Sequence, residues 1–118
     1  MGKIDSFEDI TFWQKTREFN KKIYLSTEAD KFKKNFDFVI QIRRASLSIS
    51  SNIAEEFERN TDKEFIYFLF VAIASAGEVR YQLYLALDLE YIDKVMFDVL
   101  ILEVSNMSRL ISGLIKYL

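Results

Sequence analysis

Apolar residues recur every three or four positions along four long segments of the chain, the spacing that places them on one side of an α-helix. The pattern predicts helices over residues 11–27, 36–59, 62–89 and 93–117, within a single domain spanning 1–118. The sequence contains no proline and only three glycines, the residues that most often interrupt helices. Because short connections between long helices make neighbours antiparallel, we predict an all-α, antiparallel up-down-up-down four-helix bundle.

The segment 36–59 has more apolar surface than one helix of a monomeric bundle needs. Its main apolar side runs from Phe38 to Phe57. A second seam recurs every seven residues on another side and consists of Ile40, Leu47 and Ala54. A helix that is apolar on two sides has to be covered on both. We therefore predict that the second seam contacts another copy of the chain in a homo-oligomer.

The segment 65–77 contains no charged residue on any side. Its thirteen residues rise about 20 Å as a helix, too short for a hydrocarbon core of about 30 Å, so we do not expect it to span a membrane. Thr61 and Glu64 predict a capping box just before it. Because a helix that is apolar on all sides has to be covered on all sides, we expect another copy of the chain, or a partner, to cover what the bundle leaves exposed. The predicted interface residues are Ile40, Leu47, Ala54, Tyr67, Phe70 and Val71.

The composition removes most catalytic and metal chemistry from consideration. Without histidine and cysteine, the chain lacks the usual zinc ligands, the Glu-x-x-His motif of di-iron bundles and the commonest general base. The remaining candidates are the carboxylates of Glu55, Glu56, Glu58 and Glu64, and we rank a metal or acid–base role for them well below a structural one. We expect no enzyme activity, no metal and no cofactor. The acidic first residues do not form a secretory signal, so we expect a cytoplasmic protein.

Two groups of polar residues are the candidate binding sites. A stripe on the segment 36–59 is either a phosphate or nucleotide contact or, as we favour, a hydrogen-bonded network that fixes helix register or a subunit interface. Its residues are Arg43, Arg44, Ser48, Asn52 and Glu55. The second group is a set of lysines in the first third of the chain: Lys15, Lys21, Lys22, Lys31, Lys33 and Lys34. Lysines can bind nucleic acid, but interleaved acidic residues favour a solvated surface here.

Several segments match, in order and spacing, a pattern that extends over nearly the whole chain. They are FEDI at 7–10, FWQK at 12–15, QIRRAS at 41–46, SISSNIAE at 48–55 and KEF at 63–65, followed by Phe68, Leu69, Glu78, Gln82, Leu83, Ala86, Tyr91 and Ile92. With this set the chain resembles the bacterial four-helix-bundle proteins encoded in intervening sequences of 23S ribosomal RNA genes. The resemblance implies a bundle that assembles into a ring, typically a homopentamer, without known catalytic activity. A related group serves diversity-generating retroelements and binds a reverse transcriptase and nucleic acid through a basic barrel.

The chain departs from the family pattern at three positions of the second helix. Ser50 stands where the family usually has proline, and Glu56 and Glu58 stand where it prefers glycine. Because a proline inside a helix bends it, we expect a straighter helix here. The net charge of −2 argues against the nucleic-acid binding of the basic relatives. We predict a non-enzymatic homo-oligomeric scaffold or binding module, with RNA or a protein as partner. The alternative is a nucleic-acid-binding accessory subunit of a reverse transcriptase.

Overall fold

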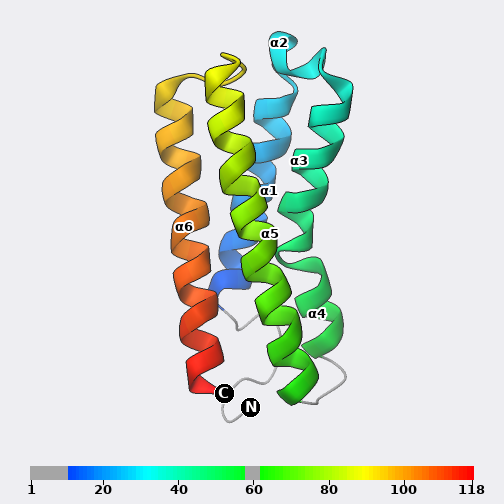
Figure 1. Cartoon of the computed structure of the whole chain (residues 1–118), viewed down its shortest axis with the longest axis vertical. Coiled ribbons are helices and arrows are strands. Elements are labelled where there is room, and N and C mark those ends of the chain that lie inside the picture. Colours follow the sequence, from blue (N-terminus) through cyan, green and yellow to red (C-terminus); the bar gives the residue numbers. More distant parts are fainter. Residues whose placement is uncertain (1–10, 58–61) are drawn as a thin grey trace.

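The computed structural model describes residues 11–57 and 62–118, and within them the chain forms six α-helices and no β-strand. The four long helices lie side by side (Figure 1). The bounds are α1 Thr11–Thr27, α2 Asp30–Lys33, α3 Phe36–Ser48, α4 Ser51–Phe57, α5 Asp62–Asp88 and α6 Lys94–Tyr117. Thr61 of the predicted capping box and Arg59 at the predicted end of the second helix lie outside the described residues.

Neighbouring helices follow a cyclic order around the bundle axis. Helix α1 packs against α3 and α6, and α5 packs against α3 and α6. Helices α1 and α5 therefore occupy opposite corners of the bundle, while α3 and α5 occupy neighbouring corners. In Figure 1, α2 and the α5–α6 turn lie at one end of the molecule, and α4 and the end of α6 lie at the other.

The core is built from the residues that recur at helical spacing. Fully buried examples are Phe19 on α1, Ile42 on α3, Leu69 on α5 and Leu100 on α6. Each such side chain contributes about 1.5–3 kcal/mol by leaving water. Burial of one stripe per helix therefore accounts for the association of the four long helices.

The segment 36–59 is not one continuous helix, so the prediction of a single helix there was wrong. It breaks at Ile49 and Ser50, between α3 and α4 (Figure 1). The amide of Ile49 donates to Ser46 O at 3.3 Å and that of Ser50 donates to Leu47 O at 3.2 Å, so the backbone tightens to bonds three residues apart. Serine hydroxyls compete with helical backbone bonds, as Ser48 Oγ does by lying 3.0 Å from Ala45 O. The break therefore exists without a proline.

The connection between α1 and α3 contains a helix that the apolar pattern did not predict. Residues 28–35 lie between two predicted helices, yet they contain the single turn α2, anchored by the fully buried ring of Phe32. This ring lies 5.2 Å from that of Phe38 and 5.0 Å from that of Tyr91, between centroids. Asn35 donates from Nδ2 to Tyr91 Oη at 3.1 Å. One aromatic cluster thus ties this link to the α5–α6 turn.

Two well-formed features fix that α5–α6 turn. Glu90 has φ of 59°, the left-handed conformation that often ends a helix. Asp93 then caps α6, accepting a bond from the amide of Met96 at 2.8 Å. The turn brings α5 and α6 into the most extensive helix pairing of the bundle.

Candidate functional site

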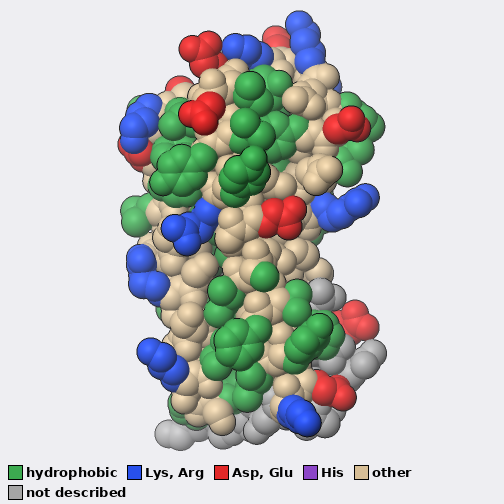
Figure 2. Space-filling model, in the orientation of Figure 1, with side chains coloured by type: hydrophobic (Ala, Val, Ile, Leu, Met, Phe, Trp, Pro, Cys, Tyr) green, Lys and Arg blue, Asp and Glu red, His purple; other side chains and the backbone are tan. Residues whose placement is uncertain are grey.

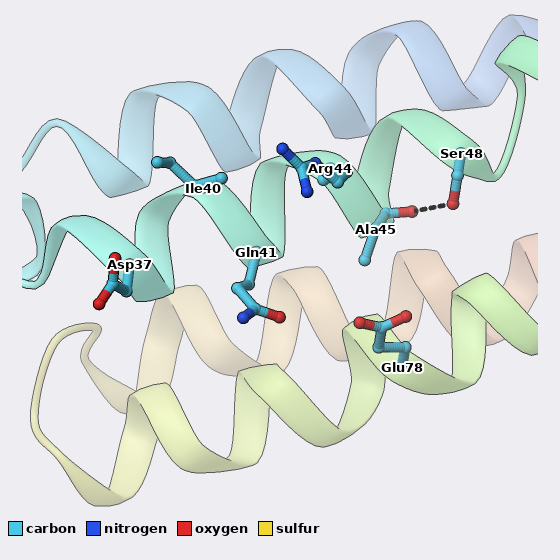
Figure 3. Close-up of a pocket in the computed structure, with 7 residues that line it drawn as sticks. All are labelled: Asp37, Ile40, Gln41, Arg44, Ala45, Ser48 and Glu78. Atoms are coloured by element: carbon cyan, nitrogen blue, oxygen red, sulfur yellow. Dashed lines mark hydrogen bonds between the residues drawn. The ribbon is translucent and has the colours of Figure 1, made fainter.

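A groove lined mainly by polar and charged side chains lies between α3 and α5. It has a volume of about 480 Å³, and its walls come from two helices (Figure 3). Its lining residues are Asp37, Ile40, Gln41, Arg44, Ala45 and Ser48 from α3, and Glu78 from α5. The hydroxyls of Ser48, which lines the groove, and of Ser75 on α5 lie 2.7 Å apart and join the two helices. The groove therefore combines two acids, one guanidinium and a small apolar wall.

The charged side chains of this groove are not neutralised within the described part of the chain. Arg44 and Asp37 make no hydrogen bond or ion pair there, and both are exposed. Glu78 accepts only one long bond, from Gln82 Nε2 at 3.4 Å. One turn further along α5, the buried Gln82 Oε1 has no partner. Groups of both signs are thus available to an external partner.

The predicted polar stripe is only partly brought together. Arg44 and Ser48 line the groove, whereas Glu55 lies on α4 beyond the helix break and is exposed. The side chain of Asn52 lies outside what the structure describes. Because the helix is interrupted at Ile49 and Ser50, the stripe does not lie on one continuous helix.

Arg43 points away from the groove and fastens α3 to the end of α1. Its Nε donates to Thr27 Oγ1 and its Nη2 to Glu28 Oε1, both at 2.9 Å, and the guanidinium lies 4.5 Å from the centre of the Tyr24 ring. The hydrogen bond from Arg43, followed by the charge of Lys33, holds the pKa of the Glu28 carboxyl below its usual range. Arg43 therefore has a structural role in the fold.

The lysines of the first third divide into two places. Lys15 and Lys22 line a second hollow of about 480 Å³ between α1 and α6, where Lys22 pairs with Glu103. At the other place, around α2, Lys31 lies 3.5 Å from Glu90 and Lys33 lies 3.8 Å from Glu28. The remaining residues, Lys21 and Lys34, are exposed. Half of these lysines are therefore paired with carboxylates rather than presented as one basic patch.

Several predicted interface residues are exposed on the single chain. Tyr67 and Phe70 on α5 are 63% and 56% exposed, and Ile40 and Leu47 on α3 are 37% and 42% exposed. Val71 and Ala54 are half-buried. Figure 2 shows hydrophobic side chains gathered in an upper and a lower group on the face where α5 runs. A single chain therefore leaves part of the segment 65–77 exposed, and the interface role of these residues stays a prediction.

The sequence pattern does not reveal three residues that only the packing brings close to the stripe. Glu78 reaches the groove from a different helix, and Thr27 with Tyr24 receives Arg43. Spacing within one segment could have found Asp37, which precedes Gln41 by one helical turn. It could also have separated Arg43 from Arg44, because adjacent helical residues point about 100° apart.

The described residues contain no group of three or more acidic side chains close enough together to hold a metal ion. Among the same residues, no helix is both long and apolar enough to cross a membrane.

Comparison with known proteins supports the resemblance noted in the sequence. The model of the 23S rRNA-intervening sequence protein family matches residues 8–113. The chain is also similar to a solved protein with unknown function, from the S23 ribosomal protein family of Bacteroides thetaiotaomicron VPI-5482. The two share 28% identity and a TM-score of 0.81, over 90% of this chain and 96% of that one. No curated protein matches. With a family match over most of its length, the chain belongs to the 23S rRNA-intervening sequence protein family.

Proposed function

We propose that this protein is a non-enzymatic scaffold built from an up-down-up-down four-helix bundle that assembles into a homo-oligomeric ring of five copies. The observation that carries the proposal is the outward side of α5. Tyr67, Phe70, Ala74, Gly77 and Tyr81 are exposed along it, in a helix that has no charged residue between Glu64 and Glu78. Monomeric proteins rarely keep a long apolar strip in water, and such strips usually mark interaction sites.

The exposure of α3 supports the same proposal. Ile40 and Leu47 form a second apolar surface, with Tyr24 of α1 beside them in a shallow hollow of about 270 Å³. A ring needs two different contact surfaces on each subunit, because every copy meets one neighbour on each side. The described chain offers both surfaces. The number five rests on the resemblance to ring-forming relatives.

Light scattering of the purified protein tests the proposal. We expect a mass five times the 13.9 kDa of one chain. The variant Tyr67→Lys should move the mass toward that of a single chain, because a charge in the contact would have to be desolvated. Leu25→Lys is the matched control, since Leu25 on α1 is as exposed as Tyr67, at 63%, and lies on the opposite corner from α5. A wild-type protein with the mass of one chain would refute the scaffold.

RNA binding stays a prediction without support from the packing. Three of the six lysines pair with carboxylates, which weakens the predicted basic patch. Neither the family description nor the solved relative points to a reverse-transcriptase partner. Binding of structured RNA measured at two salt concentrations checks this expectation, because phosphate contacts weaken steeply with salt.

A further inference from the structure

We propose that each contact in the ring packs the outward strip of α5 from one copy against the α3 seam of the next copy, with Arg44 of one copy facing Glu78 of the other. This inference rests on the proposed ring and adds which surfaces meet. The strip consists of Tyr67, Phe70, Ala74, Gly77 and Tyr81, and the seam consists of Ile40 and Leu47.

The positions of the two surfaces on the bundle favour a closed ring. Helices α3 and α5 are packed neighbours, so their outward sides point in directions that diverge by roughly a right angle rather than in opposite directions. When copies join through such surfaces, each copy is rotated by the same angle relative to the one before it. After a few subunits the last copy meets the first and the ring closes. Surfaces on opposite sides of the bundle would instead favour an open filament.

Small residues in the middle of the strip allow a close approach. Ala74 and Gly77 are exposed between the larger side chains of Phe70 and Tyr81. A Cβ built on Gly77 meets nothing within 4 Å, so no contact inside the chain requires glycine at this place. Glycine weakens a helix relative to alanine. If a helix of another copy packs closely over Ala74 and Gly77, the lack of a side chain at Gly77 is explained by that contact.

Charge complementarity indicates that the α3 seam of a neighbouring copy is what covers the α5 strip. Arg44 lies between Ile40 and Leu47 along α3 and has no ion pair with any described residue, while Glu78 follows Gly77 directly on α5 and accepts only the long bond from Gln82. Both side chains line the groove between their two helices (Figure 3). They therefore lie on the same edge of their respective surfaces, and packing seam on strip brings opposite charges together across the contact.

One consequence is the place of the groove in the assembly. The groove lies between the outward sides of α3 and α5, within the smaller of the two angles that these sides enclose. In a closed ring, the smaller angle between the two contact surfaces of a subunit opens toward the ring axis. The groove therefore faces the centre of the ring. The central opening would then be lined by Asp37, Gln41, Arg44, Ser48 and Glu78 from each copy.

Disulfide cross-linking tests this pairing, since the chain contains no cysteine of its own. We would prepare Ala74→Cys together with Leu47→Cys, and Ala74→Cys together with Ile40→Cys, and compare each pair with the single-cysteine variants after oxidation. Facing cysteines must come within about 7 Å between Cα atoms to join. We expect one pair to give a ladder of covalent products on a non-reducing gel, and the single variants to give none.

Further outcomes decide the inference. Mixing chains that carry only Leu47→Cys, or only Ile40→Cys, with chains that carry only Ala74→Cys should give covalent dimers from one of the two mixtures. A dimer from Ala74→Cys alone would show that α5 meets α5 and would overturn the pairing. So would an oligomer that yields no ladder and no mixed dimer. A wild-type monomer would instead refute the ring itself.

A charge exchange tests the polar contact separately. Arg44→Glu should reduce the oligomer mass toward that of one chain, and adding Glu78→Arg to the same chain should restore it. Arg80→Glu is the control, because Arg80 is exposed on α5 and does not line the groove. Failure of the double variant to restore the mass lost in Arg44→Glu, or an unchanged mass in Arg44→Glu, would contradict the assignment of Arg44 and Glu78.

Discussion

At the scale of single residues, two adjacent arginines have opposite roles. Arg43 is half-buried and donates hydrogen bonds to Thr27 and Glu28. Arg44, in contrast, is exposed over the α3–α5 groove and has no ion pair among the described residues. One step along a helix turns a side chain by about 100°, which is enough to move it from one helix interface to another. The first arginine therefore contributes to the fold, and the second is available for recognition.

Replacing Arg43 should destabilise the fold. Arg43→Ala removes two hydrogen bonds at 2.9 Å and the contact with the Tyr24 ring, so we expect a loss of about 1–3 kcal/mol in the free energy of unfolding. Urea denaturation measures it. Arg80→Ala should change stability by less than about 0.5 kcal/mol, because Arg80 makes no hydrogen bond or ion pair with a described residue. Equal losses in the two variants would contradict this role of Arg43.

The Glu28 carboxyl gives the stability a dependence on acid. Its pKa is lowered in the folded chain, chiefly by the bond from Arg43, so folding favours the ionised form. The stabilisation is present above the ordinary carboxyl pKa of about 4.5 and is lost as the pH falls below it. Denaturation at a series of pH values should show a shallower acid loss for Glu28→Gln than for the wild type. Identical slopes would exclude the effect.

At the scale of helices, the break after Ser48 shows that a helix can be interrupted without proline. Ile49 and Ser50 are both buried, and their amides bond to carbonyls three residues back. The geometry is set by the tight turn and by the serine hydroxyls nearby. The sequence, which lacks proline, predicted one continuous helix, whereas the chain is interrupted where serine hydroxyls compete for the backbone carbonyls.

Proline should therefore be tolerated better at the break than elsewhere on α3. Ser50→Pro removes one bond of 3.2 Å, whereas Gln41→Pro in the helix interior should cost about 3 kcal/mol. We expect the loss in Ser50→Pro to be clearly the smaller of the two. Thermal unfolding followed by circular dichroism compares them. Equal or reversed losses would mean that the tight turn does not accept the fixed proline backbone.

The elements that sequence could and could not predict differ for physical reasons. The apolar spacing fixed α1, α5 and α6 closely, and Asp93 was recognisable by position as a helix start because a carboxylate caps the exposed amides. The turn α2 was missed because Phe32, among lysines, offers no periodic signal and is held only by Phe38 and Tyr91. Within the groove, Arg44 and Ser48 were foreseen from one helix, but Glu78 depends on how α5 packs.

At the scale of the whole molecule, the chain buries a continuous core and still leaves apolar side chains on two helices. Phe19, Ile42, Leu69 and Leu100 fill the interior, while Tyr67 on α5 remains largely in water. One subunit therefore buries its core but leaves apolar side chains exposed on its surface. In our proposal, neighbouring copies cover these exposed side chains.

If assembly covers this surface, the unfolding temperature must depend on protein concentration, because association stabilises only the folded state. We expect the midpoint of thermal unfolding of the wild type to rise over about a hundredfold increase in concentration. Phe70→Lys should show no such rise, since its 56% exposed side chain lies in the proposed contact. A midpoint that stays constant for the wild type would contradict assembly in this range.

Helix α4 has only seven residues, and α5 is the helix it packs against most. A helix of seven residues is not stable by itself in water, so the backbone hydrogen bonds of α4 depend on its packing against α5. The amide protons of α4 should consequently exchange with deuterated solvent sooner than those in the middle of α3. Opening of the subunit is thus expected to begin at the end of the bundle that lies farthest from the aromatic cluster of Phe32.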